Sequence, residues 1–199
     1  IRDGLKAVNQ IGAPLETLWP YIESRYAVRP SSTAYTDASR RKVTGYAKCT
    51  NFSAVKNALA AGNPVVIGFD VYESFESDAV AQTGQMPYPN TATEQLLGGH
   101  AVCLVGYTDS TQKFIARNSW GTSWGDHGYF YMPYQVIQNT SMSSDFWTMS
   151  GVANLAVPAP GSTVSVSVSA PTTNGAPNKV SLVTETTRPV AVNVVAVGQ

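Results

Sequence analysis

The stretch LLGGHAVCLVGY (residues 96–107) decides the fold class of this chain. Its apolar run from residue 100 onward predicts a buried strand, and the polar segment TDSTQ (108–112) predicts the turn that follows it. KFIARNSW (113–120) and GYFYMPY (128–134) predict two further strands, since both are rich in aromatic and β-branched residues. Three such runs in close succession indicate a small antiparallel barrel or sheet.

Two predicted helices and a fourth strand accompany these runs. DGLKAVNQI (3–11) and FSAVKNALAAG (52–62) place apolar residues at helical spacing, with Ser53 as the candidate N-cap of the second helix. PVVIGFDV (64–71) is a β-branched run that predicts a buried strand. The expected fold class is therefore α+β, an antiparallel β-barrel with a few helices.

The rest of the chain divides into predicted loops and an extension. Residues 26–42 are polar and rich in Ser, Thr and Arg, and residues 72–95 form a long predicted loop that would border a site. From about residue 151 aromatic residues disappear and Val, Ser, Thr and Pro dominate. We therefore expect a main domain over 1–150 and a β-rich or extended extension over 151–199, which would pack against neighbours in an assembly.

Bulk composition excludes several classes of function. The chain has 199 residues, no net charge and only 13% charged residues. Its densest basic run, at residues 40–42, is interpreted as a solvated loop, so no nucleic-acid partner is expected. No apolar stretch approaches the roughly 20 residues of a membrane span. The opening residue, Ile1, suggests a processed product, a fragment or the traced portion of a longer chain.

Metal and cofactor chemistry has no obvious ligands in the sequence. There are two histidines and two cysteines, and they do not cluster, so neither a metal site nor a cofactor is expected. His127 is interpreted as a solvated loop residue. Asp70 and the carboxylates that follow it are interpreted as solvated loop charges. The sequence leaves open whether Cys49 and Cys103 form a disulfide.

His100 is the strongest candidate for chemistry. Asn118 lies one predicted hairpin further along the chain, and antiparallel pairing across that hairpin would bring its side chain near the ring. A carboxamide oxygen that accepts one imidazole N–H fixes the tautomer and aims the other ring nitrogen at a nucleophile. Trp120 would cover this hydrogen bond and exclude water from it.

The stretches GGHAVCLVGY and RNSWGTSWGDHGYFYMPY resemble the papain-like cysteine peptidases, family C1. That family carries its histidine in a similar strand and follows it with an N-S-W-G-x-x-W-G-x-x-G-Y stretch. Order and spacing match here, and the ending SDFWTM (144–149) is similar to the bacterial or viral branch. The resemblance covers about residues 1–150 and implies a papain-like fold, of which this chain is the C-terminal portion.

The resemblance also implies roles for individual residues. His100 would be the general base and the cationic partner of a thiolate, Asn118 would orient it, and Trp120 would shield the pair. Trp124 would form the wall of the cleft on the side that holds the leaving group.

Two small residues complete the site that the resemblance implies. Gly68 and Ala101 would line the pocket for the residue next to the scissile one. Their small size would favour a bulky apolar substrate side chain.

One part of the family pattern is missing. The nucleophilic Cys stands in a Q-x-x-x-C-G-S-C-W stretch that this sequence lacks, and the family spacing would place it roughly 30–50 residues before Ile1. Cys103 should point away from His100, since side chains alternate along a strand, and is interpreted as a small buried residue. Cys49 is interpreted as structural or inert.

Two hypotheses follow. In the first, the chain is the C-terminal portion of a cysteine endopeptidase that acts on peptides or proteins, and a separate Cys-bearing segment or chain supplies the nucleophile. In the second, it is a catalytically inactive or self-processed papain-fold subunit of a larger assembly such as a virus particle. Both hypotheses predict that the chain alone hydrolyses nothing. Secretion or association with a virion is the expected location.

Overall fold

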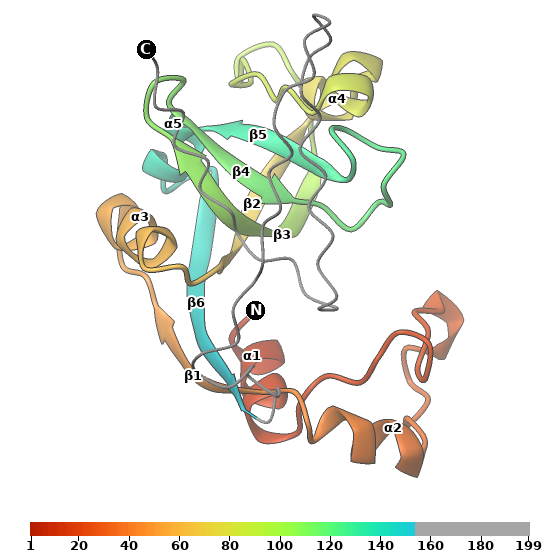
Figure 1. The fold of residues 1–199 in the computed structure, drawn as a ribbon. Coiled ribbons are helices and arrows are strands. Elements are labelled where there is room, and N and C mark those ends of the chain that lie inside the picture. The colour runs from red at the N-terminus through yellow and green to blue at the C-terminus, as the bar shows by residue number, and fades with distance from the viewer. Residues whose placement is uncertain (154–199) are drawn as a thin grey trace, which may run out of the picture. The chain divides into compact units, whose positions relative to one another are not determined.

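The computed structural model describes residues 1–153, which fold around a six-stranded antiparallel sheet (Figure 1). The α+β fold class is confirmed, with few and short helices around the sheet. In spatial order the strands are β1 (Lys42–Lys48), β6 (Ser143–Ala153), β2 (Val65–Tyr72), β3 (Leu96–Thr108), β4 (Lys113–Arg117) and β5 (Tyr129–Pro133). The helices are α1 (Arg2–Gln10), η1 (Glu23–Arg25), α2 (Ser32–Ala38), α3 (Phe52–Ala60), η2 (Glu73–Glu76), α4 (Asp78–Thr83) and α5 (Tyr134–Gln138).

The predicted hairpin of β3 and β4 is present. Thr108 pairs with Lys113 across the turn, as the polar segment between the two apolar runs predicted. β3 begins earlier than predicted, because its first residues pair with the end of β2. His100 therefore lies inside a long strand, directly opposite Phe69 of β2.

β6, like β1, is a strand that the sequence did not predict. It pairs with β1 on one side and β2 on the other, so it joins the two halves of the sheet. A bulge in β6 interrupts its pairing with β2: Asp145 and Phe146 stand against the single residue Ile67, and Asp145 adopts a left-handed conformation with φ = 57°. The strand ends at Ala153, past the boundary predicted at residue 150. The predicted extension otherwise lies outside the described residues.

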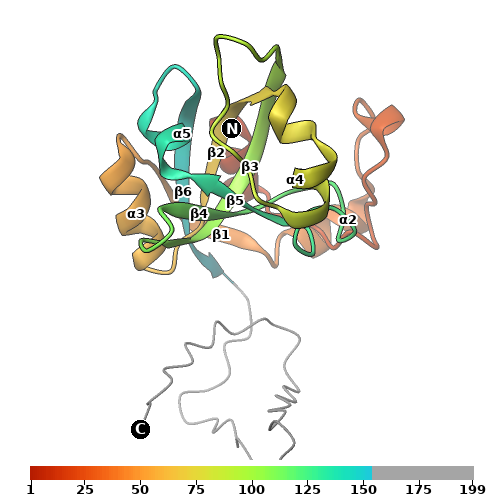
Figure 2. The same cartoon turned by 90° about the horizontal axis from the view of Figure 1, so that it is seen from above.

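Several local predictions need correction. α3 is capped by Asn51, whose side chain accepts a hydrogen bond from the backbone N–H of Ala54, and not by Ser53. The predicted loop over 26–42 contains α2 and the start of β1. The predicted loop over 72–95 contains η2 and α4, which lies well apart from α3 with the strands between them (Figures 1 and 2).

Two charged residues that were predicted to be solvated in loops, Arg41 and Asp70, lie elsewhere. Arg41, from the basic run predicted to be a solvated loop, forms an ion pair with Asp37 of α2. Asp70 is a residue of β2 rather than of a loop. Among the described helices, none is both long and apolar enough to cross a membrane.

The core supports the strand that carries His100. Phe75 of η2 is 1% exposed, and its ring centre lies 5.3 Å from that of Phe69 and 5.1 Å from that of Phe130. Edge-to-face contacts of this kind add to the burial of large apolar surface. The ring of Phe69 in turn lies 5.9 Å from the His100 ring. An aromatic layer therefore fixes the underside of the predicted site.

Candidate active site

The structure brings His100 and Asn118 together. His100 lies in β3 and Asn118 directly follows β4, and His100 Nε2 is 2.9 Å from Asn118 Oδ1. Asn118 is 9% exposed, and its hydrogen bond with His100 is partly buried. A buried hydrogen bond is stronger than an exposed one, because water does not compete for its partners.

The identity of the Asn118 atom at this bond follows from a second contact. The backbone N–H of Ser119 lies 2.8 Å from the same Asn118 Oδ1. A backbone N–H can only donate, so the atom that accepts it must be the amide oxygen and not the amide nitrogen. His100 Nε2 must then be the donor towards Asn118. In the neutral ring the proton sits on Nε2, and Nδ1 carries a lone pair that can accept a proton.

The loop over 118–128 holds Asn118 in position. The backbone N–H of Asn118 donates to the carbonyl of Gly128 over 2.9 Å, and that of Gly128 donates to the carbonyl of Trp124 over 2.8 Å. Gly128 has φ = 89°, and a Cβ there would lie 3.2 Å from the carbonyl oxygen of Gly121. Glycine is the residue that adopts this backbone conformation without strain, so the loop closes tightly at this point.

Trp120 covers the ring of His100. The two rings stack with centres 5.0 Å apart and planes 21° apart, and Trp120 keeps 40% of its surface exposed. Trp120 also contacts Phe75, with ring centres 5.6 Å apart. The imidazole is therefore held from the side by Asn118 and over its face by Trp120, whereas Nδ1 has no hydrogen-bond partner among residues 1–153.

Trp124 takes a different position from the other predicted site residues. It is half-buried and packs edge-to-face against Trp120 and Phe130, with ring centres 5.0 Å and 5.8 Å away. It does not line the cavity beside His100. Its predicted role as the wall on the leaving-group side stays a prediction, and its contacts here are those of a support for Trp120.

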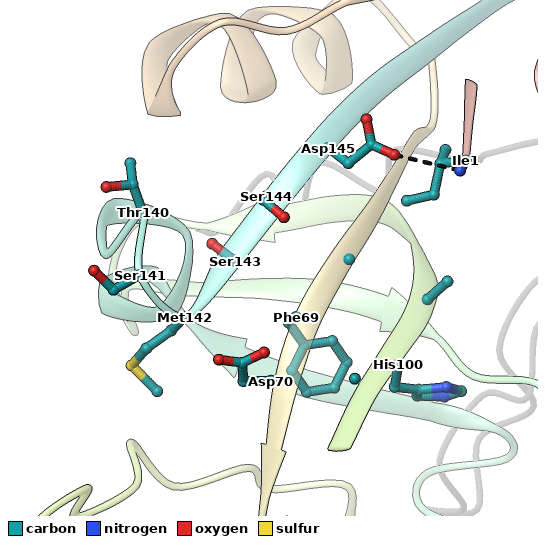
Figure 3. A pocket seen from close by; sticks show the side chains of 13 residues that line it. Ile1, Phe69, Asp70, His100, Thr140, Ser141, Met142, Ser143, Ser144 and Asp145 are labelled. Atoms are coloured by element: carbon teal, nitrogen blue, oxygen red, sulfur yellow. Dashed lines mark ion pairs between the residues drawn. The ribbon is translucent and has the colours of Figure 1, made fainter. Parts of the chain in front are cut away.

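A cavity of about 400 Å³ adjoins His100 (Figure 3). Gly68 and Ala101, the two predicted pocket residues, both line it, and they face each other across β2 and β3. Asp70 and Gly99 are the next pair on the same face of these strands. The third side comes from residues 140–145, which lead into β6.

Asp145 is a pocket residue that the sequence reasoning missed. Trp147 Nε1 donates to Asp145 Oδ1 over 2.6 Å, and this hydrogen bond, together with smaller contributions, holds the pKa of Asp145 below its usual range. The main-chain nitrogen of Ile1 lies 3.3 Å from the other carboxylate oxygen. The bulge breaks the two-residue alternation that would have identified β6 in the sequence, so no clear signal pointed to Asp145.

Neither thiol of the chain is placed as a nucleophile. Cys49 and Cys103 are both free, so the open question of a disulfide is answered in the structure. Burial raises the pKa of both thiols, which disfavours the thiolate that nucleophilic attack requires. Neither lines the cavity beside His100.

Within residues 1–153, the remaining ionisable side chains suggest no further centre. His127 is 90% exposed and lies 2.8 Å from a carboxylate oxygen of Asp126. Within residues 1–153, no three His, Cys, Asp or Glu side chains lie close enough together to hold a metal ion.

Comparison with known proteins identifies the family of this chain. The model of the papain family of cysteine proteases matches residues 3–149. An uncharacterized peptidase C1-like protein of Acanthamoeba polyphaga mimivirus is 39% identical over 163 residues, which cover 77% of this chain and 52% of that protein. A gut-specific cysteine proteinase of Caenorhabditis elegans is 36% identical over 101 residues, or 50% of this chain and 29% of that protein.

A solved structure has a similar fold. Xylellain, a cysteine protease from Xylella fastidiosa, superposes with a TM-score of 0.66 and 37% sequence identity, covering 75% of this chain and 60% of that chain. The chain thus spans about half the length of the mimivirus relative and somewhat more of xylellain. The family model covers most of the sequence, and the fold agrees with it. The chain therefore belongs to the papain family of cysteine proteases.

Proposed function

We propose that this chain supplies the general base of a cysteine endopeptidase and that its peptide or protein substrate binds in the cavity beside His100. The observation that carries the proposal is the contact of 2.9 Å between His100 Nε2 and Asn118 Oδ1. Together with the Ser119 N–H, it leaves Nδ1 as the proton-accepting nitrogen.

The proposed roles follow from this tautomer. Nδ1 of His100 takes the proton of a cysteine thiol, which leaves a thiolate beside an imidazolium. The thiolate attacks the substrate carbonyl, and the Nδ1 proton then passes to the departing amine. Asn118 accepts from Nε2–H in both protonation states, so it orients the ring throughout. Trp120 shields this hydrogen bond from water.

In this proposal the nucleophilic Cys lies on a segment or chain outside this sequence. Both cysteines of the chain have raised pKa values and lie away from the cavity. A similar protein such as xylellain is longer than the stretch that matches here, which leaves room for such a segment. The Cys-bearing segment would place its thiol within hydrogen-bonding distance of Nδ1 of His100.

Covalent labelling of the full-length gene product tests the proposal. A peptide-based, thiol-directed inhibitor should label one cysteine that is encoded upstream of Ile1, and mass spectrometry locates it. The same protein should cleave peptides, and the chain of 199 residues alone should cleave none. Absence of any labelled upstream cysteine would remove the proposal.

The alternative is a catalytically inactive or self-processed structural subunit, for example of a virus particle. The similarity to a mimivirus protein supports a viral origin of the chain, whereas the similarity to xylellain of Xylella fastidiosa does not. The paired His100 and Asn118 and the stacked Trp120 favour the enzyme, since packing alone does not require this polar pair. Secretion or virion association stays a prediction.

A further inference from the structure

A tight turn at residues 126–129 fixes the backbone of Asn118. The N–H of Asp126 donates to the carbonyl of Tyr129 over 2.9 Å, and the N–H of Tyr129 donates to the carbonyl of Asp126 over 3.0 Å. Gly128 lies inside this turn, and its carbonyl accepts the hydrogen bond from the N–H of Asn118. A displacement of the turn would therefore displace Asn118 as well.

The backbone of this turn needs support from outside. Gly125 and Gly128 have φ values of 62° and 89°, and between them His127 has φ = 54° although it carries a side chain. A residue other than glycine is strained in this left-handed region, and it stays there only where its surroundings fix the backbone. Contacts between the turn and a more rigid element therefore decide whether the turn keeps its shape.

The carboxylate of Asp126 makes such a contact. The hydroxyl of Tyr131 donates to Asp126 Oδ2 over 2.6 Å, and this hydrogen bond is partly buried. The other oxygen, Oδ1, lies 2.8 Å from Nδ1 of His127 on the exposed side of the turn. A hydrogen bond to an ionised acceptor is stronger than one between neutral groups. The Tyr131 hydroxyl therefore ties the Asp126 side chain, and with it the turn, to β5.

The charge states of the two groups favour this hydrogen bond. The Tyr131 hydroxyl, and to a smaller extent the His127 ring, hold the pKa of Asp126 below its usual range. In return, the hydrogen bond to Asp126 raises the pKa of Tyr131, with a smaller contribution from burial. At neutral pH Asp126 is therefore ionised and Tyr131 keeps the proton that it donates.

Tyr131 is itself held by main-chain pairing. It lies opposite Ile115 of β4, and its N–H donates to the carbonyl of Gly84, which follows α4, over 2.8 Å. Two neighbouring elements thus restrain the backbone of Tyr131. A side chain that projects from such a position is a suitable anchor for the turn at Asp126.

We propose that Asp126 and Tyr131 are positioning residues for the general base. Through the turn they hold Asn118 in the orientation that keeps the proton of His100 on Nε2. The inference rests on the proposed function, in which Nδ1 must be free to accept the proton of a thiol. A small displacement of Asn118 Oδ1 would weaken its contact of 2.9 Å with Nε2 and allow the ring to change its tautomer.

Nitrogen-15 NMR of the His100 ring in the chain of 199 residues measures the ratio of the two neutral tautomers. Tyr131→Phe removes only the hydroxyl that donates to Asp126, and Asp126→Ala removes the acceptor. In each folded variant the ratio of the Nε2–H to the Nδ1–H tautomer should fall by about fivefold, as the loss of one hydrogen bond allows. Asp126→Asn keeps an oxygen that can accept from Tyr131 and should restore most of the ratio.

Two further variants show whether the effect belongs to this hydrogen bond. Tyr129→Phe removes a hydroxyl of the same strand that makes no hydrogen bond within residues 1–153, so it should leave the tautomer ratio unchanged. The double variant Asp126→Ala, Tyr131→Phe should lower the ratio no further than either single variant, because both remove the same bond. An unchanged ratio in Tyr131→Phe and Asp126→Ala, or an equal fall in Tyr129→Phe, would overturn the inference.

Kinetics of the full-length protein separate this inference from the proposed function. Tyr131→Phe should lower kcat for peptide cleavage by about twofold to fivefold, because a less restrained ring meets the thiol less often. KM should change little, since neither Asp126 nor Tyr131 lines the cavity beside His100. A tautomer ratio that falls as expected supports the inference even if the full-length protein cleaves nothing, in which case the proposed function alone fails. A ratio that does not fall overturns the inference, and cleavage by the wild type would then leave the proposed function intact.

Discussion

The corner around His100, formed with Asn118 and Trp120, and the cavity beside it are built from different parts of the chain. One hairpin and the loop after it supply His100, Asn118 and Trp120, and Phe69 of β2 lies beside the imidazole. The cavity is assembled by β2, β3 and the start of β6, with small side chains on its floor and carboxylates on its walls. The corner fixes the position of Nδ1 of His100, whereas the cavity leaves an open volume beside the ring.

This contrast separates the chemistry of the site from its selectivity. Contacts on several sides of His100 leave its ring little freedom, which suits a group that must meet another atom at hydrogen-bonding distance. Gly68, Gly99 and Ala101 bring little side chain into the cavity, so a change there should alter which substrate binds more than it alters the position of His100. The following changes test this division, from the largest expected effect to the smallest.

Removing the imidazole should have the largest effect. We expect His100→Ala to lower kcat/KM of the full-length protein by about 10⁴-fold, since it removes the proposed general base. His127→Ala is the matched control, because His127 is the other histidine of the chain and is 90% exposed. Equal losses in the two variants, or full activity of His100→Ala, would contradict the proposed role.

Removing the aromatic support should unfold the corner. Phe75 is 1% exposed and packs against Trp120, Trp124 and Phe130. Phe75→Ala should lower the free energy of unfolding by about 3–5 kcal/mol, measured by urea titration, because it leaves a cavity among packed rings.

An exposed aromatic residue provides the control for this loss. Tyr26 is 92% exposed, so Tyr26→Ala should change the free energy of unfolding by less than about 0.5 kcal/mol. Similar values for the Phe75 and Tyr26 variants would show that the aromatic layer does not stabilise the corner.

Filling the cavity should change selectivity more than stability. A Cβ at Gly68 would lie 3.5 Å from the carbonyl oxygen of Ser144, which is ordinary contact, so Gly68→Val should fold. The added methyl groups would occupy the cavity floor. We expect cleavage of a peptide with a long side chain at this position to fall about tenfold, and cleavage of the matching Ala peptide to change little.

Gly4→Ala is a control outside the cavity, since a Cβ there meets no atom within 4 Å. If Gly68→Val slowed both peptides equally, or if Gly4→Ala produced the same change in selectivity, the cavity would not be the substrate pocket.

The smallest expected effect concerns the segment that leads into β3. Glu94 accepts hydrogen bonds from the backbone N–H groups of Ser74, at 3.0 Å, and Asn90, at 2.7 Å. Hydrogen bonding by Ser74, with a smaller contribution from Asn90, lowers the pKa of Glu94. A lowered carboxyl pKa stabilises the fold above the unfolded pKa of about 4.3, and this stability is lost as the pH falls through the folded value.

Thermal unfolding as a function of pH measures this contribution. Glu94→Gln should lower Tm slightly at pH 7, and the difference from the wild type should close as the pH falls below about 4. Glu23→Gln is the control, since the Glu23 side chain makes no hydrogen bond within residues 1–153. A difference between wild type and Glu94→Gln that stays constant with pH would contradict the assigned role of this carboxylate.

The sequence predicted the corner because its geometry is local. An apolar strand, a polar turn and a second strand place His100 and Asn118 near each other whatever the rest of the chain does. The stacking of Trp120 follows from its position two residues after Asn118. The same locality explains why the fold class and the central hairpin were predicted.

The cavity could not be predicted in the same way, because it depends on pairing between distant segments. Asp145 reaches the wall through a bulge in β6 opposite Ile67, a residue far away in the sequence. A bulge removes the regular alternation by which a strand is recognised, and a carboxylate in a polar segment suggests a solvated loop. Asp70 was misread for this second reason.

Nitrogen-15 NMR of the His100 ring in this chain tests the central claim most directly, because it needs neither the nucleophile nor a substrate. At a pH where the ring is neutral, we predict the proton on Nε2 and an unprotonated Nδ1, as the contacts of Asn118 Oδ1 with His100 and Ser119 require. Asn118→Ala should produce a mixture of the two tautomers. A proton on Nδ1 in the wild-type chain would contradict the account, since His100 would then have no nitrogen with which to activate a thiol.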